Sequence, residues 1–252
     1  MIIFKKFYFI CKNNLFIYSN YFLLESILRL IFNNKLNDIL YYNSLNVAFV
    51  SIPKTGNSSL NSVFLDKLGV IYDKKNYQSV HLSKNRFKIN HKKLVNLDCY
   101  KFTFVRNPFE RLVSCYVSKV LNENHNMNKK YFGIINRNLS FEKFVKIVCK
   151  VPNFMSDFHF VSQDYLLFEN GKLIVDDVLK FEDLEKNFEC IRKKYELNYL
   201  PHLNKTDKPD YRSFYTSELV KLVYSRYKND IVYFDYVIEY EELLNFCKNM
   251  RN

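Results

Sequence analysis

One lysine stands in a short polar turn that follows an apolar run. Val47 to Ile52 is almost continuously apolar, which is typical of a strand covered on both faces of a parallel sheet. After Lys54 the turn continues with small and polar residues: Thr55, Gly56, Asn57, Ser58 and Ser59. Backbone N–H groups, hydroxyls and an ammonium group that meet at a helix N-terminus suit a phosphate or sulfate group. We therefore expect this turn to bind an anionic nucleotide.

A second strand and turn carry arginine and serine. The run Tyr100 to Val105 predicts a strand, and it leads directly into Arg106. Asn107 is a plausible N-cap, and Pro108 suits the first position of a helix, where its missing N–H costs nothing. On that helix, three residues spaced at i, i+3 and i+7 share a polar face beside the arginine: Arg111, Ser114 and Ser118. This pattern predicts a second anion site.

The two motifs together resemble the 3′-phosphoadenosine 5′-phosphosulfate (PAPS)-dependent sulfotransferases. The similarity is to the family that includes the Golgi carbohydrate sulfotransferases and their bacterial relatives. Ile52 to Ser59 resembles the 5′-phosphosulfate loop of that family, and Val105 to Ser114 resembles its 3′-phosphate segment. His159 to Gln163 and Val178 to Leu184 are similar to later blocks of the family. The resemblance covers roughly residues 45 to 240.

The resemblance implies a role for each motif. Sulfuryl transfer is an in-line displacement, so most of the catalysis should come from positioning and charge stabilisation. Lys54 would contact the bridging oxygen and offset charge on the leaving phosphate, while residues 55–59 would wrap the 5′-phosphate. Arg106 and Ser114 would hold the 3′-phosphate, with the guanidinium group acting as a bidentate clamp.

A histidine is expected to deprotonate the acceptor hydroxyl. His81 is the first candidate because it lies between the two phosphate motifs, where bacterial members of the family resemble this chain with a histidine. His159 is the second candidate and His91 the third, although a surface or core role is common for any single histidine. Glu110 is a poor base because a cationic cluster should keep it paired, and Arg111 has an alternative structural role in pairing with Glu110 or an acidic neighbour.

The first turn differs from that of a P-loop ATP or GTP enzyme. A Walker A loop needs a glycine-rich run, with lysine at the helix start and a hydroxyl for Mg²⁺. Here the lysine precedes the loop, and Gly56 is its only glycine. No metal is expected, since the six cysteines are scattered without a C-x-x-C pair. Their scatter also argues against a disulfide framework and fits a reducing compartment.

The chain carries a formal net charge of +12, which predicts an electropositive surface. Such a surface would attract an anionic cosubstrate, an acidic glycan or anionic lipid, although a lysine-rich solvated surface explains the charge equally well. No RNA-binding signature stands out, so nucleic acid is not expected as a partner. The expected acceptor is a carbohydrate, including an acidic glycan or a lipid-linked sugar, and the oligomeric state stays open.

The N-terminal residues are rich in Phe, Leu and Ile, but Leu15 to Phe32 contains polar interruptions: Ser19, Asn20, Glu25 and Arg29. A spanning helix needs about twenty apolar residues with few charges. We therefore expect an amphipathic helix that caps the domain, or touches a membrane surface through residues 1–40. The predicted domains are a helical extension over residues 1–44 and a sulfotransferase domain over residues 45–252. The expected location is the cytoplasm or the cytoplasmic membrane face in a bacterium, and the Golgi lumen in a eukaryote.

The order of these patterns predicts an α/β fold: a three-layer, P-loop-like sulfotransferase fold with a central parallel sheet flanked by helices. The predicted function is transfer of a sulfuryl group from PAPS to a carbohydrate hydroxyl. Two alternatives stay open. One is a nucleotide-dependent phosphotransferase that requires Mg²⁺, and the other is a basic glycan- or membrane-binding protein with a degenerate sulfotransferase fold. Acceptor specificity would reside in segments 70–99 and 122–160 and in the tail.

Overall fold

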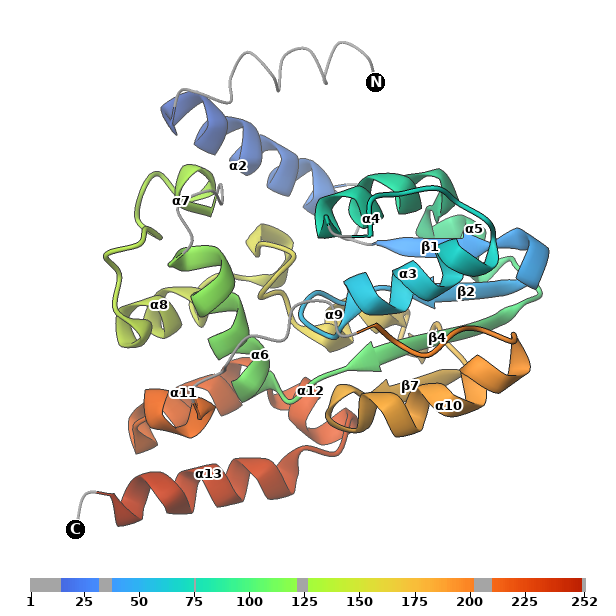
Figure 1. The fold of residues 1–252 in the computed structure, drawn as a ribbon. Coiled ribbons are helices and arrows are strands. Elements are labelled where there is room, and N and C mark those ends of the chain that lie inside the picture. The colour runs from blue at the N-terminus through green and yellow to red at the C-terminus, as the bar shows by residue number, and fades with distance from the viewer. Residues whose placement is uncertain (1–14, 32–37, 75, 122–126, 202–209, 251–252) are drawn as a thin grey trace.

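A five-stranded sheet lies at the centre of the computed structural model, which describes residues 15–31, 38–74, 76–121, 127–201 and 210–250. The sheet has the order β3-β1-β2-β4-β7, with helices on both faces (Figure 1). Its strands are β1 (Ile39–Tyr42), β2 (Val47–Val50), β3 (Lys88–Ile89), β4 (Tyr100–Val105) and β7 (Asp177–Lys180). A separate pair joins β5 (Phe168–Glu169) to β6 (Lys172–Leu173). The predicted α/β class is confirmed.

Helices connect the strands and form the C-terminal part of the described chain. They are α2 (Leu15–Ile31), α3 (Asn57–Lys67), α4 (Tyr77–Ser83), α5 (His91–Val95), α6 (Pro108–Cys115), α7 (Met127–Lys130), α8 (Phe141–Val148), α9 (Gln163–Leu167), α10 (Leu184–Lys194), α11 (Ser217–Arg226), α12 (Lys228–Tyr233) and α13 (Val237–Asn249). Short 3₁₀ turns cover Asn43–Leu45, Lys84–Phe87, Asn153–Met155, Phe181–Asp183 and Tyr211–Phe214. A π-helical turn, Tyr116–Val120, continues α6, and such turns are frequent at functional sites.

The strands that lead to the candidate site are parallel. β2 pairs in parallel with β4, and β4 with β7, so that Phe49 lies opposite Phe102 and Thr103 opposite Val178. β1 is antiparallel to both β2 and β3. The predicted parallel arrangement thus holds for β2, β4 and β7. The antiparallel strands β1 and β3 had no counterpart in the sequence prediction. β1 also lies inside the segment predicted as an N-terminal extension.

Side chains of β2 and β4 alternate between two apolar cores, because successive residues of a strand point to opposite faces of the sheet. Phe49 and Phe102 stack with ring centroids 5.0 Å apart, in the core that includes residues of α3 and α10. Ala48 and Val50 belong to the other core, with residues of α6, α8, α11 and α13. Burial on both faces explains why β2 is apolar at every position.

The carboxyl ends of β2 and β4 lie side by side because these strands are parallel neighbours. Each end leads into a turn and then a helix, α3 after β2 and α6 after β4. The side chain of Asn107 caps α6 by accepting a hydrogen bond from the N–H of Phe109, and Pro108 occupies the first turn, both as predicted. The two predicted anion sites therefore share one edge of the sheet.

The segment 70–99, which looked irregular in the sequence, contains α4, a 3₁₀ turn, β3 and α5. Asn76 caps α4 by accepting from the N–H of Gln78, and Asn90 caps α5 by accepting from the N–H of Lys93. These helices have seven and five residues, too few for a strong apolar period. In the sequence, the capping residues Asn76 and Asn90 are the local signals of where these two helices begin.

Helix α2 occupies the position predicted for an N-terminal amphipathic helix, but polar side chains face the protein. Among residues 19–31, the buried ones are Ser19, Phe22, Ser26 and Arg29, while Leu24, Ile27, Leu28, Leu30 and Ile31 are exposed. The helix contacts α7 and the turn Asn153–Met155. Among the described residues, no helix has the length and hydrophobicity that crossing a membrane requires.

Candidate active site

The turn between β2 and α3 is shaped by its own side chains. Thr55 Oγ1 and Asn57 Nδ2 both donate to the carbonyl oxygen of Ile52, at 2.7 and 2.6 Å. The first intrahelical bond of α3 runs from the N–H of Leu60 to the carbonyl of Gly56, so the N–H groups of residues 57–59 point out of the helix N-terminus. The side chains of Thr55 and Asn57 fix the turn, and its backbone amides are left to receive an anion.

Two residues of the turn have left-handed backbone conformations. Gly56 has φ 75°, and a Cβ atom there would stand 3.1 Å from side-chain carbons of Phe181 and Leu184, so only glycine fits. Lys54 also has φ 75°, although it carries a side chain. A lysine in this region costs about 1–2 kcal/mol. Strain of this kind concentrates at functional positions, which supports a role for Lys54.

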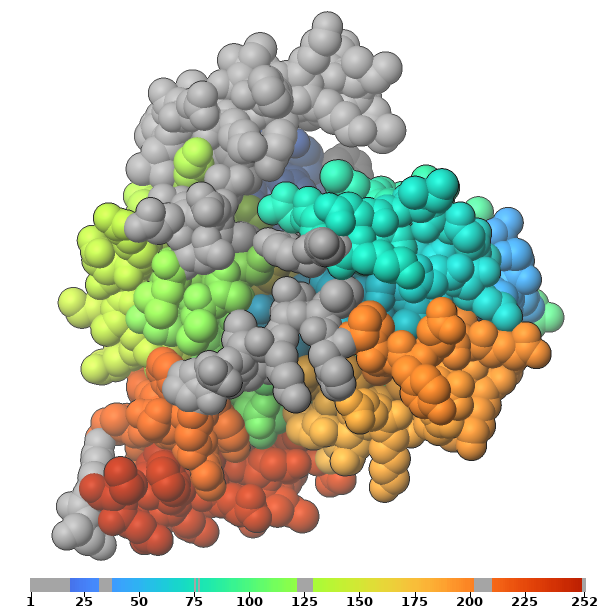
Figure 2. Space-filling model, in the orientation of Figure 1, coloured from blue at the N-terminus to red at the C-terminus, as the bar shows by residue number. Residues whose placement is uncertain are grey.

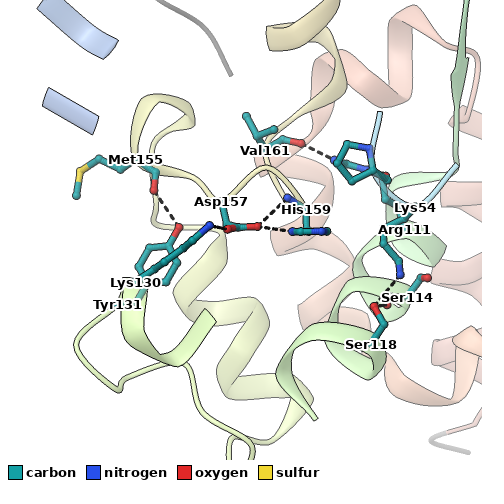
Figure 3. A network of polar contacts seen from close by, with 11 residues as sticks. Lys54, Arg111, Ser114, Ser118, Lys130, Tyr131, Met155, Asp157, His159 and Val161 are labelled. Carbon is teal, nitrogen blue, oxygen red and sulfur yellow. Dashed lines mark hydrogen bonds and ion pairs between the residues drawn. The ribbon is translucent and has the colours of Figure 1, made fainter. Parts of the chain in front are cut away.

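The side chain of Lys54 joins the first turn to the helix after β4. Its Nζ atom donates to Ser118 Oγ at 2.7 Å, and Ser118 Oγ donates to the carbonyl oxygen of Ser114 at 2.7 Å (Figure 3). Ser118 belongs to the π-helical turn that continues α6. The ammonium group thus lies at the polar face that the sequence predicted for this helix, next to the predicted 3′-phosphate ligand Ser114.

Two buried arginines hold the backbone of the first turn. Arg106 donates through Nη1 to the carbonyl of Lys54 at 3.1 Å and through Nη2 to Glu110 at 2.8 Å. Arg111 donates through Nε to the carbonyl of Pro53 at 3.1 Å and through Nη1 to that of Val161 at 2.7 Å. Of the structural partners considered for Arg111, Glu110 is not bonded to it. Glu110 pairs instead with Arg106, the residue just before the N-cap of α6.

Buried donors around this turn have no acceptor among the described residues. They are Arg106 Nε, Arg111 Nη2 and Ser51 Oγ. Guanidinium groups only donate hydrogen bonds, and a buried donor without an acceptor is costly. Unpaired buried groups of this kind are often completed by an ion or ligand. The residues present therefore fit a phosphate-bearing nucleotide at the ends of β2 and β4.

The backbone of Arg106 is fixed by a buried glutamine. Gln163 accepts from the N–H of Arg106 and donates to its carbonyl, both at 2.9 Å. The N–H of Gln163 in turn donates to Asp230 at 2.9 Å. Burial raises the pKa of Asp230 to about 7. These contacts link the turn after β4 to α9 and α12, and they give a structural reason for the similarity at His159 to Gln163.

His81, the first predicted base, faces the start of α3 from helix α4. Its Nε2 atom lies 3.3 Å from Ser58 Oγ. Burial and the nearby ammonium group of Lys84 lower the pKa of His81 to about 4, and the charge of Asp38 opposes them only partly. The imidazole is therefore neutral at neutral pH and can accept a proton.

His159, the second predicted base, is bound to a buried carboxylate. Asp157 Oδ1 lies 2.7 Å from His159 Nδ1 and accepts from the backbone N–H of His159 at 2.9 Å. Lys130 bonds the other oxygen of Asp157 (Figure 3). Although burial alone would raise it, Lys130 and His159 hold the pKa of Asp157 well below its usual range. Burial lowers the pKa of His159. A charged carboxylate only accepts, so the proton of neutral His159 lies on Nδ1.

The structure brings most predicted site residues together, but it separates one. His81 and His159 are within electrostatic reach of each other and of Lys119. His91 lies elsewhere, on α5, with Nε2 3.9 Å from Glu169. The sequence prediction missed Asp157. The available signal was a carboxylate two residues before His159, a spacing at which aspartate bonds the backbone ahead of it.

The fold and the site together define an α/β protein in which two strand-to-helix turns, both predicted to bind anions, lie at adjacent ends of parallel strands. A family model described as "Sulfotransferase family" matches residues 37–237. The chain therefore belongs to the sulfotransferase family, whose members transfer sulfuryl groups. Comparison with curated proteins gave no match, and neither did comparison with solved structures.

Proposed function

We propose that the chain transfers a sulfuryl group from PAPS to a hydroxyl of a carbohydrate acceptor. The observation that carries the proposal is the convergence of Lys54 with buried donors of Arg106 and Arg111 that have no acceptor among the described residues. Two anion-binding turns at neighbouring strand ends suit a nucleotide with phosphate at both its 5′ and 3′ positions. Bound PAPS would supply an activated sulfuryl group.

The turns after β2 and β4 form the donor half of the site. The N–H groups of residues 57–59 hold the 5′-phosphate at the start of α3, where the helix dipole favours negative charge. Arg106 and Ser114 hold the 3′-phosphate. Lys54 offsets the negative charge that develops on the leaving phosphate oxygen, and Ser118 keeps its ammonium group in place.

The two histidines form the acceptor half of the site. His81 takes the hydroxyl proton on Nε2, while the acceptor oxygen bonds to sulfur and the bond from sulfur to the phosphate oxygen breaks. Its lowered pKa keeps the ring neutral at neutral pH but also makes it a weaker base than an ordinary histidine. His159 is the second candidate for the same role, because Asp157 holds the Nδ1 proton and leaves Nε2 as the basic nitrogen.

The charge of the acceptor half supports an acidic acceptor. Lys119 lies close enough to both histidines to lower their pKa values. The whole chain has a net charge of +12. A cationic group beside the proposed bases would attract a carboxylate or phosphate on the acceptor. An acidic glycan or a lipid-linked sugar fits this requirement.

Peripheral contact with a membrane is proposed for the outer side of α2. Leu24, Ile27, Leu28 and Ile31 recur at i, i+3, i+4 and i+7 and are all exposed. Such a stripe suits the boundary between lipid head groups and acyl chains. The positive net charge suits anionic lipid, and a lipid-linked acceptor would be reached from the same surface.

Transfer of labelled sulfuryl groups from PAPS to a panel of carbohydrates, in the presence of EDTA, tests the proposed function. Wild-type protein is expected to label an acceptor. Lys54→Ala is expected to lose the transfer, whereas Lys67→Ala retains it, since Lys67 pairs with Glu196 at the other end of α3. Phosphate transfer from ATP that requires Mg²⁺ would instead show a phosphotransferase. Binding of adenosine 3′,5′-bisphosphate without turnover on any acceptor would favour a degenerate, binding-only fold.

A further inference from the structure

Helix α2 precedes the residues that match the family model, yet it contacts the acceptor half of the site. A helix that packs on a protein core normally turns its apolar side inward. Among residues 19–31 of α2, the buried ones are Ser19, Phe22, Ser26 and Arg29. Over this described part, α2 is held on the protein largely by specific polar and aromatic contacts rather than by an aliphatic stripe.

Ser19 joins α2 to the segment that carries Lys130. Its hydroxyl group donates to the carbonyl of Lys129 and accepts from the N–H of Phe132 at 3.0 Å. The Ser19 side chain therefore bonds the backbone on both sides of the pair Lys130 and Tyr131. Helix α7 has only four residues, and a helix of one turn has almost no stability of its own. Its position therefore depends on neighbouring segments: α2, the π-helical turn after α6, and Asp157.

Phe22 supports the same segment from one turn further along α2. Its ring lies edge-on to Tyr131, with centroids 5.3 Å apart, and Lys130 Nζ lies 5.3 Å from its ring centroid. The hydroxyl of Tyr131 donates to the carbonyl of Met155 at 2.9 Å, in the turn that leads to Asp157 (Figure 3). Helix α2, α7 and the 153–157 segment thus form one connected support.

The support ends at the imidazole of His159. Lys130 bonds Asp157, and Asp157 bonds His159 Nδ1 at 2.7 Å. The carboxylate of Asp157 is fully buried. A buried carboxylate that loses its cation must take up a proton or find another partner. Protonation would weaken the acceptor that keeps the His159 proton on Nδ1, and a new partner would draw the carboxylate away from it.

We propose that Ser19 and Phe22 of α2 are positioning residues for His159, acting through Lys130 and Asp157. The inference rests on the proposed function only in the role given to His159 toward the acceptor. In this proposal α2 belongs to the acceptor half of the site. Ser19 and Phe22 bond or pack against residues 129–132, which lie outside the two phosphate turns, so their substitution should not disturb the donor half.

The experiment uses the full chain and the substitutions Ser19→Ala and Phe22→Ala. Ser19→Thr keeps the hydroxyl and serves as the rescue variant, and Phe22→Leu is a milder change for use where another variant does not fold. Leu24→Ala and Ile27→Ala are matched controls on the exposed side of the same helix. For each protein we would record NMR spectra of the histidine ring nitrogens, kcat and KM for transfer, and the Kd of adenosine 3′,5′-bisphosphate.

Wild-type protein and both controls are expected to show His159 with its proton on Nδ1. Ser19→Ala and Phe22→Ala should show a mixture of tautomers, with the Kd of the bisphosphate unchanged. Where His159→Ala lowers kcat on a soluble acceptor, these two variants should lower it about tenfold or more. Ser19→Thr should restore both the Nδ1 tautomer of His159 and the wild-type kcat. Identical His159 spectra in Ser19→Ala, Phe22→Ala and the controls would overturn the proposal. If wild-type protein shows no transfer, the proposed function fails, and the spectra alone decide on the positioning role.

Discussion

The donor half and the acceptor half of the site are built in different ways. The donor half consists of two turns, each contiguous in sequence and shaped first by side chains of its own: Thr55 and Asn57 in one, and Asn107 in the other. The acceptor half collects His81 from α4, His159 from a loop, and Lys130 from α7, which α2 supports. Under the proposed function, contiguous motifs would bind the nucleotide, whereas contacts between distant segments would position the groups that face the acceptor.

The two halves also differ in how they treat charge. In the donor half, buried N–H groups of Arg106 and Arg111 have no acceptor among the described residues, which suits a bound anion. In the acceptor half, Asp157 and Lys130 neutralise each other and burial keeps both histidines neutral. The donor half is thus suited to bind an anion, and the acceptor half is suited to accept a proton. Substitutions in the two halves should therefore affect different measured quantities.

The largest effect is expected in the donor half, at Lys54. Lys54→Ala should lower kcat by about 10²–10³, because it removes the cation that stabilises the leaving group. Lys54→Gly should be equally inactive, but its free energy of unfolding should exceed that of Lys54→Ala by about 1 kcal/mol, since the residue has φ 75°. Kinetic assays and denaturant titrations measure the two quantities. Normal turnover in either variant would remove Lys54 from the mechanism.

The next effect is expected at His81. His81→Ala should lower kcat by about 10² while the Kd of the bisphosphate stays unchanged. In wild-type protein, kcat/KM should stay level as the pH falls below the ordinary histidine value of 6.5 and should drop only near pH 4, because His81 must be neutral. An acidic limb at 6.5 would contradict the lowered pKa of His81. His159→Ala provides the comparison that shows which imidazole takes the proton.

The same shift in the pKa of His81 affects stability. Between the folded value of about 4 and the ordinary value of 6.5, the unfolded chain binds more protons at this histidine than the folded chain does. The contribution of His81 to the free energy of unfolding is therefore present above this window and is lost as the pH falls through it. His81→Gln should flatten that part of the stability profile, as measured by denaturant titration at several pH values.

A smaller effect is expected at Gly56. Gly56→Ala should lower the free energy of unfolding by about 1–2 kcal/mol, since φ is 75° and the new Cβ would lie 3.1 Å from Phe181 and Leu184. It should also weaken binding of the bisphosphate, because the turn must shift. Gly171→Ala, with the same φ but open space around it, separates backbone strain from the contact. Equal losses in the two variants would show that the contact contributes nothing.

The smallest effect on turnover is expected on the outer side of α2. The double substitution Leu24→Ser and Ile27→Ser should leave transfer to a soluble acceptor unchanged, because both side chains are exposed. It should reduce sedimentation of the protein with vesicles that contain anionic lipid. Unchanged sedimentation would exclude this side of α2 from membrane contact.

The donor half could be predicted from the sequence because its signals are local. The run before Lys54 and the pair Asn107 and Pro108 specify strand, cap and helix within a few residues. Short helices such as α4 carry no comparable period, and β1 has only four residues. The link from Ser19 to Lys129 and Phe132 joins residues more than one hundred positions apart. Nothing local encodes such a contact. The two candidate histidines could therefore be named from the sequence, whereas Asp157, Lys130 and the support from α2 were recognised only in the structure.

The most direct measurement is transfer of labelled sulfuryl groups from PAPS in EDTA, with wild-type protein and Lys54→Ala run in parallel on the same acceptors. Labelled carbohydrate and adenosine 3′,5′-bisphosphate should form in equal amounts with wild-type protein, and neither should form at a comparable rate with Lys54→Ala. Absence of acceptor-dependent transfer by the wild-type protein, or equal rates for the two proteins, would contradict the assigned donor site.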